Sequence, residues 1–595
     1  MSFKAVFLTF LLLLGCMAPR LYAAPAEIPT VLGEEDIKRY RRIFELQEQA
    51  KWNQADKMMK RVENDVLMGH VWFQRYMHPT GYRSKYSELA GWLKSYADHP
   101  NAWRVYSLAR RRQGKAHAPR RPEDTRYPGV TGQSADPKPP LPSRTRDERG
   151  SVTTFMANVR RYVRNGDPDR AEKRYWAMVA RDLLVPHEEA EALERIAASY
   201  YYKSNNFKAR VLATRAADLA REIVPESDWI AGLASWRDGD FKTAYTHFQH
   251  VANSERAGSW LLSGGQFWAG RAAYRLGDPV AGINHLLAAS TQVETFYGLI
   301  ASRQLGIRPD IDWSVPELNQ NAVDSLMEHI ATKRAIALTE VGRDDIADEE
   351  LRLLWGREGT TVQEDLLALG AALNLPNIQI RLGRAGGTGK PASTAVRYPL
   401  PDWAPAGGFS VDRALIFAMV RKESDFRIRA KSRVGAGGLM QVMPATASYI
   451  SKDRKLLRRN KGRLFEPEFN MALGQQYIEY LLDMEYVEGN LFMALAAYNG
   501  GPGSLMGWRN EVIYDEDPLL FIESIGFYET RNYIERVMAN LWLYRMRLGQ
   551  DTPSLDAIAS GAWPALELLD TEQTAIAHQR ALTRTTTRTT ISADD

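Results

Sequence analysis

A weak internal repeat constrains the fold of this chain more than any other feature of its sequence. Residues 229–241 align with residues 267–279 at an offset of 38, and both copies are aromatic-rich stretches that end in a Gly-Asp turn. The glycine suits the left-handed turn that ends a helix, and the aspartate can cap the next helix. Residues 162–168 echo the same turn. Helical hairpins of this period stack side by side, so the repeat predicts a superhelix of the tetratricopeptide type rather than a chance likeness between amphipathic helices.

The sequence from about residue 30 to 370 has the same helical character. Ala, Leu, Arg, Glu, Trp and Tyr recur at helical spacing, and the alternation of Val, Ile and Thr that is typical of strands is almost absent. We therefore expect the all-α fold class. At 595 residues the chain exceeds the size of a single hydrophobic core, which stops growing at about 250–300 residues, so two or more domains are expected.

Three segments interrupt the helical pattern. Residues 115–150 are rich in proline and charge, which predicts an extended loop. Residues 384–408 contain Gly-Gly-Thr-Gly and several prolines, as is typical of a junction between domains. Residues 549–595 lose periodicity and predict a disordered tail. Residues 409–548 form a separate unit.

The N-terminus predicts export. Lys4 precedes an apolar run of 14 residues, and small residues near Ala24 offer a cleavage site, so residues 1–24 are interpreted as a signal peptide. The run is shorter than the roughly 20 residues that span a bilayer. We expect a soluble protein of the Gram-negative periplasm. The alternative is an outer-membrane lipoprotein anchored through Cys16, because Leu-Leu-Gly-Cys resembles a lipobox.

Several function classes are excluded by composition. The net charge of +5 is too small to indicate a nucleic-acid partner. Cys16 is the only cysteine, which excludes disulfides and cysteine catalysis in the mature domains. Residues 409–548 contain no His, no Cys and no glycine-rich loop after a strand, which argues against serine-histidine, zinc and nicotinamide chemistry. No metal and no cofactor are expected.

Glu423 is the candidate acid. A helix is predicted to begin near Val411 with Ser410 as its N-cap, which places Leu415, Met419 and Glu423 on one face. A carboxyl group that extends an apolar stripe is desolvated, and desolvation raises its pKa towards the range that a general acid needs. The alternative is a solvated carboxylate at a helix end.

Two further segments carry candidate binding groups. Three glycines within residues 435–438 allow the backbone to approach a ligand closely, and Gln441 and Met443 follow them. The amide of Gln441 can bind an acetamido or hydroxyl group, and Met443 offers an adaptable apolar wall. Tyr498 and Asn499 end a helix before another glycine-rich turn, where the alternative is an ordinary helix cap.

The last segment, residues 523–533, opens a final helix and contains Glu529 and Arg531. Both side chains would be surface charges if they stood alone. The four segments together resemble the catalytic domain of soluble lytic transglycosylases of family 1, whose fold is that of goose-type lysozyme. That family's pattern is Glu-Ser, then Gly-Leu-Met-Gln near Met-Pro, then Ala-Tyr-Asn-x-Gly, then Pro-Phe-x-Glu-Thr-Arg-x-Tyr. The present sequence departs from it at Gly500, in place of Ala, and at Gly526, in place of Pro.

The resemblance implies an organisation and a set of site residues. It implies a ring-forming superhelix over residues 27–372, a short helical linker domain over 373–408 and a lysozyme-like catalytic domain over 409–548. Glu423 matches the family's catalytic glutamate. The positions that match its glycan-binding cleft are Ser424, Gln441, Met443, Tyr498, Asn499 and Glu529.

The resemblance also implies the reaction. The family cleaves the β-1,4 bond between N-acetylmuramic acid and N-acetylglucosamine with one glutamate and forms 1,6-anhydro-N-acetylmuramic acid, working from chain ends in cell-wall turnover. Asp425 is a poor second carboxylate, since two residues along a helix rotate a side chain by about 200° from Glu423. The alternatives are a hydrolysing muramidase and a non-catalytic, glycan-binding helical scaffold. Expected partners are peptidoglycan glycan strands and cell-wall synthesis proteins, a membrane only through Cys16, and the protein is expected to be a monomer.

Overall fold

The computed structural model describes residues 26–125, 139–385 and 393–570. The predicted signal peptide and the lipobox at Cys16 lie outside these residues. The chain divides into two compact units, one formed by residues 1–128 with 315–373 and the other by 129–314 with 374–595. The described residues contain helices and isolated β-bridges but no strand, so the all-α prediction is confirmed.

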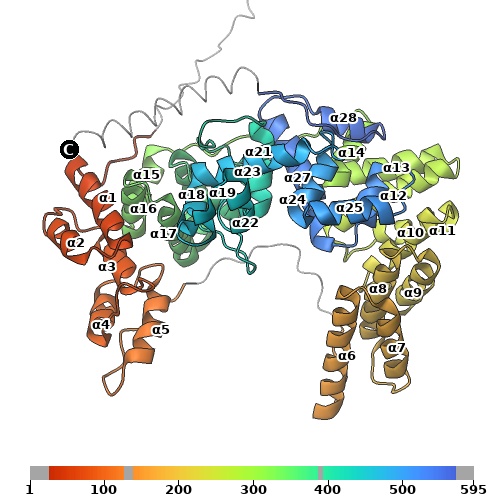
Figure 1. Ribbon diagram of the computed structural model, residues 1–595, viewed down its shortest axis with the longest axis horizontal. Helices are drawn as coiled ribbons and strands as arrows, with labels where there is room; N and C mark the ends of the chain where they lie inside the picture. The colour runs from red at the N-terminus through yellow and green to blue at the C-terminus, as the bar shows by residue number, and fades with distance from the viewer. Residues whose placement is uncertain (1–25, 126–138, 386–392, 571–595) are drawn as a thin grey trace, which may run out of the picture. The chain divides into compact units, whose positions relative to one another are not determined.

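Unit 1 consists of short helices from two distant stretches of the sequence (Figure 1). Its helices are α1 (Glu34–Glu48), α2 (Trp52–Met59), α3 (Met68–Tyr76), α4 (Tyr86–Ser95), α5 (Ala102–Arg112), α15 (Gln320–Met327), α16 (Ile330–Glu340), α17 (Asp344–Glu358) and α18 (Gln363–Ala372). None of the described helices in either unit is both long and apolar enough to cross a membrane.

Unit 2 begins with a stack of helical hairpins. Its first helices are α6 (Arg146–Arg164), α7 (Pro168–Val179), α8 (Pro186–Tyr201), α9 (Asn206–Ala220), α10 (Glu226–Arg237), α11 (Phe241–Ala252), α12 (Ser259–Arg275), α13 (Pro279–Ser290) and α14 (Phe296–Gln304). Consecutive helices pack against one another through this series.

The predicted Gly-Asp turns are confirmed. Gly239 takes φ 74° after α10, and the carboxylate of Asp240 accepts a hydrogen bond from a first-turn backbone N–H of α11. Asp278 caps α13 in the same way, after Gly277 with φ 77°. The hairpin of α8 and α9 uses this turn too, with Ser204 and Asn205 in place of glycine and aspartate, and that substitution hid it in the sequence.

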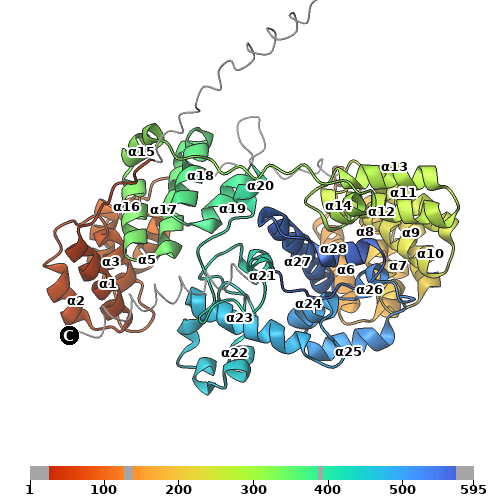
Figure 2. The ribbon, with the colours of Figure 1, turned by 90° about the horizontal axis from the view of Figure 1, so that it is seen from above.

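The second part of unit 2 carries the candidate site. Its helices are α19 (Pro376–Arg384), α20 (Thr394–Arg397), α21 (Arg413–Ser424), α22 (Pro444–Ser451), α23 (Pro467–Leu482), α24 (Leu491–Gly500), α25 (Pro502–Glu511), α26 (Pro518–Ser524), α27 (Tyr528–Arg547) and α28 (Pro553–Ala559). Figure 2 shows α21 beside the long helix α27.

The N-terminus of α21 differs from the prediction. The helix begins at Arg413, and Asp412, not Ser410, occupies the N-cap position. Asp412 is buried in an ion pair with Arg545, with 2.7 Å between its Oδ2 and a guanidinium nitrogen. The backbone N–H of Leu569 donates to its other oxygen. Asp412 therefore anchors α21 to α27 and to the C-terminal segment, a role that a local capping pattern does not reveal.

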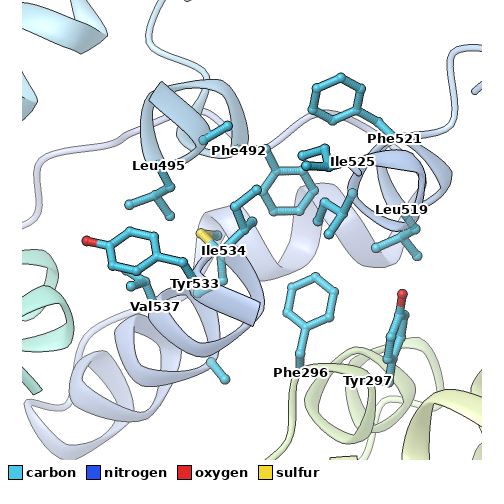
Figure 3. Close-up of a cluster of buried hydrophobic side chains, with 14 of the residues drawn as sticks. Phe296, Tyr297, Phe492, Leu495, Leu519, Phe521, Ile525, Tyr533, Ile534 and Val537 are labelled. Carbon is cyan, nitrogen blue, oxygen red and sulfur yellow. The ribbon is translucent and has the colours of Figure 1, made fainter. Parts of the chain in front are cut away.

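One hydrophobic core joins the hairpin stack to this second part (Figure 3). Phe296 of α14 stacks on Trp542 of α27 with ring centroids 5.3 Å apart, and it also contacts Phe492 of α24. Tyr297 donates a hydrogen bond of 2.6 Å to the buried Glu523. The two parts consequently fold as one unit, and the domain boundaries expected from the sequence stay predictions.

The prediction of a disordered tail is wrong for residues 549–570, and residues 571–595 lie outside the described part of the chain. Residues 549–570 are ordered around α28, and their backbone pairs with the start of α24 through a hydrogen bond from Leu491 N–H to Pro564 C=O. Trp563 packs against Phe492 and Phe521, so burial of its ring explains the order. The predicted loop 115–150 ends sooner, since α6 starts at Arg146, and its residues 126–138 lie outside the described part.

Candidate active site

Glu423 stands one residue before the end of α21. Leu415 and Met419 are completely buried as predicted, but so is every residue from Ala414 to Val420, so α21 is buried on all sides here and has no single apolar stripe. Asp425 ends the helix in the left-handed conformation with φ 50°, and Phe426 follows with φ 61°. Two consecutive non-glycine residues at positive φ turn the chain sharply after Glu423. Glu423 is partly buried and thus lies where the buried helix α21 reaches the surface of the domain.

The carboxyl group of Glu423 titrates far from its ordinary range. Burial is the main cause and raises its pKa to about 7. The Tyr533 hydroxyl and the Lys422 ammonium group favour the charged form and lower this pKa, whereas the charge of Glu529 raises it. A group that is half protonated near neutral pH can donate a proton and take one back without a large penalty in either direction.

Two stacked tyrosines lie near this carboxyl group. The rings of Tyr498 and Tyr533 are parallel within 4°, with centroids 6.1 Å apart. Tyr498 donates a hydrogen bond of 2.9 Å to the backbone C=O of Met440. The Tyr533 hydroxyl is close enough to Glu423 to bias its titration, although the two groups form no hydrogen bond of standard geometry. Tyr533 was not predicted as a site residue, although it ends the Glu-Thr-Arg-x-Tyr motif.

The side chain of Asn470 holds the loop that contains Gln441 in place through hydrogen bonds. The buried Asn470 amide accepts from Met440 N–H at 2.8 Å and donates to the C=O groups of Gly437 and Leu464 at 2.9 and 2.8 Å. Gln441 takes φ 47°, and its own amide NH2 donates to backbone C=O groups of the same loop. The side-chain carbonyl oxygen of Gln441 is therefore available to accept a hydrogen bond from a ligand. Asn470 was missed because nothing in its local sequence distinguishes it.

The glycines before Gln441 serve internal packing. A Cβ atom on Gly438, which has φ 81°, would lie 2.0 Å from the C=O oxygen of Leu464 and 2.3 Å from Asn470 Nδ2. The interpretation that these glycines let the backbone approach a ligand is therefore corrected at Gly438, where the close approach is to the protein's own chain. Gly438 is required for the contact between this loop and α23.

The remaining predicted residues differ in their surroundings. The Ser424 hydroxyl is buried and donates to the C=O of Val420, within its own helix. Asn499 accepts a hydrogen bond of 2.7 Å from Thr530, which links the end of α24 to the start of α27. Glu529 and Met443 are exposed. The structure thus brings Glu423, Tyr498, Asn499 and Glu529 together around the ends of three helices, with the Gln441 loop attached through Tyr498.

Asp425 is engaged elsewhere. Both of its carboxylate oxygens accept hydrogen bonds of 2.7 Å from the guanidinium group of Arg384 in α19. A carboxylate in a bidentate ion pair is a weak nucleophile and a weak base. This ion pair supports the expectation that Glu423 works without a second carboxylate from its own helix.

Comparison with known proteins finds a family model that matches the segment with most of these residues. Residues 404–517 match the model of the transglycosylase SLT domain. We call this stretch the SLT domain, after the family model that it matches. A soluble lytic murein transglycosylase of Salmonella typhimurium is 38% identical over 144 residues, which cover 24% of this chain and 22% of that protein. The resemblance predicted from the order of the motifs is thereby confirmed.

A second relative and a solved structure extend the likeness beyond the SLT domain. A soluble lytic murein transglycosylase of Escherichia coli K12 is 29% identical over 269 residues, or 44% of this chain and 41% of that protein. The chain thus matches less than half the length of these two relatives. The crystal structure of the 70 kDa soluble lytic transglycosylase of Escherichia coli superposes with a TM-score of 0.58 at 17% identity, covering 90% of this chain and 100% of that one. This superposition shows a shared fold.

The two departures from the family pattern, at Gly500 and Gly526, have different surroundings. A Cβ atom on Gly500 would lie 2.5 Å from the indole ring of Trp508, so the glycine makes room for that ring rather than loosening the turn. A Cβ atom on Gly526 would meet only Tyr202, at an ordinary 3.5 Å. The glycine is sterically required at position 500 and not at 526.

Outside the SLT domain, unit 1 contains one buried group of potential metal ligands, namely His70, His99 and Glu350, among the described residues. The Asn101 N–H donates to His99 Nδ1, which leaves the ring proton on Nε2 to donate to His70 Nδ1 at 2.9 Å. His70 then donates from Nε2 to Glu350 at 2.7 Å. Arg334 also pairs with Glu350. Because all four ring nitrogens are used and a cation already neutralises the carboxylate, this group fits a hydrogen-bond relay better than a metal site.

Proposed function

We propose that this protein is a peptidoglycan lytic transglycosylase that cleaves the β-1,4 bond between N-acetylmuramic acid and N-acetylglucosamine. The observation that supports this proposal most strongly is the single carboxyl group of Glu423, whose pKa is raised to about 7 and which lies near the buried Tyr533 and the half-buried Tyr498. The SLT domain around it and the named activity of the relatives support the assignment.

In the first step, Glu423 protonates the glycosidic oxygen as the bond to the anomeric carbon breaks. The carboxylate that remains is stabilised by the hydroxyl group of Tyr533 and by the ammonium group of Lys422, both of which favour its charged form. The acetamido oxygen of the substrate can support the anomeric carbon, which removes the need for a second protein carboxylate.

In the second step, the Glu423 carboxylate takes the proton of the muramic acid C6 hydroxyl, whose oxygen attacks the anomeric carbon. The product is a 1,6-anhydro ring, and no water is consumed. Intramolecular attack benefits from a high effective molarity, so the C6 hydroxyl can react with the anomeric carbon before water does. We further propose a periplasmic location, which the export-type N-terminus supports. We also propose action from strand ends in cell-wall turnover, as the resemblance to soluble lytic transglycosylases implies.

Mass spectrometry of the products released from purified peptidoglycan tests the reaction. We expect muropeptides that are lighter by one water than those from a hydrolysing muramidase. Products that carry only reducing muramic acid ends would show that the protein is a hydrolase and not a transglycosylase. Binding without any release by the wild-type protein would instead indicate a glycan-binding scaffold.

Glu423→Gln tests the acid. It removes the proton donor at nearly constant shape, so we expect glycan binding to persist and turnover to disappear. Glu485→Gln is the matched control, because Glu485 is an exposed glutamate of the same SLT domain. If Glu423→Gln retains turnover, another residue must be the catalytic acid.

A further inference from the structure

The SLT domain contains a strongly basic stretch that the net charge of the chain conceals. Residues 431–463 include nine Lys and Arg residues and one acid, Asp453. The whole chain has a net charge of only +5, so the rest of it carries more acids than bases. Positive charge is thus concentrated in one part of one domain.

The first part of this basic surface is a tight hairpin formed by residues 431–437. Its ends are joined by an antiparallel bridge between Lys431 and Gly437. Val434 lies near the tip of the hairpin and is 78% exposed. The base of the hairpin contacts the segment that follows α22, because a Cβ atom on Gly437 would lie 3.6 Å from the side chain of Leu464.

The second part is the connection between α22 and α23, residues 452–466, which we call the basic loop (Figure 2). It contains two short 3-10 turns, whose side chains Leu456 and Leu464 are buried. Leu457, in contrast, is 41% exposed. The hairpin and the basic loop therefore form one surface on which Val434 and Leu457 are exposed apolar side chains.

Most cations of this surface have no acidic partner. Arg463 pairs with Glu466 and covers the ring of Phe469. The carboxylate of Asp453 accepts a hydrogen bond from the backbone N–H of Lys455. Eight further cations are exposed, and among the described residues their side chains form no ion pair or hydrogen bond: Lys431, Arg433, Lys452, Arg454, Lys455, Arg458, Arg459 and Lys461. Together they create a local positive potential that attracts anions.

Charge alone would fit any polyanion, but the two apolar side chains narrow the choice. A soluble polyanion gains nothing from Val434 or Leu457, because both stay in water beside it. The surface of a bilayer of anionic phospholipids accommodates both kinds of side chain, since cations pair with phosphate groups while apolar side chains enter the headgroup region. Each Lys or Arg near such a surface strengthens binding roughly five-fold.

We propose that the hairpin and the basic loop dock the SLT domain reversibly on a bilayer that contains anionic phospholipids. Arginine suits this contact, because its planar guanidinium group pairs with a phosphate group through two hydrogen bonds. Four of the eight unpaired cations are arginines. The docking goes beyond the proposed function and is independent of it, since it requires neither the carboxyl group of Glu423 nor a lipid attached at Cys16.

Flotation of the protein with lipid vesicles tests the docking and needs no turnover. The mature chain is used, without the predicted signal peptide, so that the N-terminal apolar run does not itself bind lipid. Vesicles of phosphatidylglycerol are compared with neutral vesicles of phosphatidylcholine. The loop variant is R454Q/K455Q/R458Q/R459Q. The charge-matched control is R146Q/R149Q/R160Q/R164Q, which removes four exposed arginines from α6 in the same unit.

The wild type should float with the anionic vesicles and not with the neutral ones. The loop variant should lose affinity for the anionic vesicles by at least about ten-fold, because four charges near the lipid surface are removed. The control variant should bind as the wild type does, and added salt should weaken binding by both. Equal losses in the two variants, or no wild-type flotation, would overturn the inference.

A fluorescent label at the tip of the hairpin tests the contact itself. Cys16 is the only cysteine and lies in the predicted signal peptide, so mature Val434→Cys can be labelled at a single position with an environment-sensitive dye. The emission should shift to the blue when anionic vesicles are added. The same dye on Ala157→Cys, at an exposed position of α6, should not respond. Flotation without a shift at position 434 would place the contact elsewhere and overturn the proposal.

Val434→Asn separates a bilayer from a soluble polyanion, because it removes an exposed apolar side chain without changing the charge. Its affinity for phosphatidylglycerol vesicles should fall about three-fold, as loss of a partly buried valine side chain implies. Its affinity for polyglutamate, a soluble polyanion, should not change. An unchanged affinity for the vesicles would show that the surface recognises charge alone, and this result would overturn the bilayer as its partner.

Discussion

Tyr533 lies parallel to Tyr498 with ring centroids 6.1 Å apart, and the charge of Glu423 acts on both hydroxyl groups. Burial is the main cause that raises the pKa of each tyrosine well above its ordinary value, and the nearby carboxylate raises it further. Both side chains therefore stay neutral and can donate hydrogen bonds. Tyr498 uses its proton to hold Met440, which leaves Tyr533 as the donor that faces the acid.

Tyr533→Phe should slow the reaction without unfolding the protein. The hydroxyl favours the Glu423 carboxylate that forms when the proton leaves, so its loss should lower kcat about ten-fold. The alkaline limb of the pH profile should move to higher pH, because the pKa of Glu423 loses a lowering influence. Initial rates measured between pH 5 and 9 test both effects.

Tyr544→Phe is the control for this comparison. Tyr544 is a second fully buried tyrosine of α27 whose hydroxyl has no hydrogen-bond partner among the described residues. Its removal should leave kcat and the pH profile unchanged. If the pH profiles of Tyr533→Phe and Tyr544→Phe are the same, Tyr533 has no influence on the pKa of Glu423.

Glu423→Gln should stabilise the protein in alkali but not in acid. The folded-state pKa of about 7 lies above the ordinary value of 4.5, so the carboxyl group destabilises the fold as pH rises from 4.5 through 7. At pH 8 the variant should be more stable by on the order of 2–3 kcal/mol, and at pH 4 the difference should vanish. Urea unfolding at both pH values measures this, and an equal gain at the two would contradict the assigned pKa.

Sequence patterns predicted those features of the structure that depend only on residues close together in the chain. The Gly-Asp turns at Gly239 and Gly277 are helix ends that depend on neighbouring residues alone, and both were predicted from their spacing. Burial of Leu415 and Met419 before Glu423 was also predicted, but the burial of every other residue from Ala414 to Val420 comes from packing on all sides of α21 and not from helical periodicity.

Residues whose role depends on distant contacts were not predictable. Asp412 was missed as the start of α21 because its partner Arg545 lies 133 residues away. Asn470 supports a loop about 30 residues earlier in the chain through two hydrogen bonds, to Met440 and Gly437, and no periodicity marks such a residue. The same holds for the C-terminal segment, which is ordered because Trp563 packs on distant rings.

Asn470→Ala should weaken both stability and catalysis. Loss of three buried hydrogen bonds leaves the N–H of Met440 and the C=O groups of Gly437 and Leu464 without partners, which should cost about 2–4 kcal/mol. The Gln441 loop should shift, so kcat/KM should fall in protein that remains folded. Asn253→Ala, at an exposed helix end, should change stability by less than about 0.5 kcal/mol.

Urea unfolding and kinetics at a low temperature, where the variant stays folded, separate the two effects of Asn470→Ala. A loss of stability with unchanged kcat/KM would show that Asn470 supports the fold but does not position the loop for catalysis.

Gly500→Ala should destabilise the SLT domain, although alanine is the family's usual residue. The added Cβ atom would lie 2.5 Å from the Trp508 ring, and the resulting overpacking should cost about 1–3 kcal/mol. In a Trp508→Leu background the alanine should be neutral, and a double-mutant cycle measures this coupling. Gly526→Ala has room at 3.5 Å and serves as the control. Additive effects of the changes at positions 500 and 508 would refute steric compensation.

Unit 1 should lose stability as the pH falls below about 6.5, the ordinary pKa of histidine. Burial, aided by the neighbouring His70 and Arg334, lowers the pKa of His99 well below that value in the folded state. The unfolded chain therefore binds the proton first, and the stability that is present above pH 6.5 is lost as pH falls. An added proton has no acceptor in the relay, since Asn101 N–H already occupies His99 Nδ1.

The pH dependence of unfolding identifies the histidine responsible. Wild-type stability should fall by about 1 kcal/mol per pH unit between pH 6 and pH 5 on account of His99. His99→Gln should be less stable at pH 7, because its amide cannot reproduce the relay, but its stability should depend less on pH. Exposed His117→Gln should keep the wild-type slope. Equal slopes for wild type and His99→Gln would show that the relay does not respond to acid.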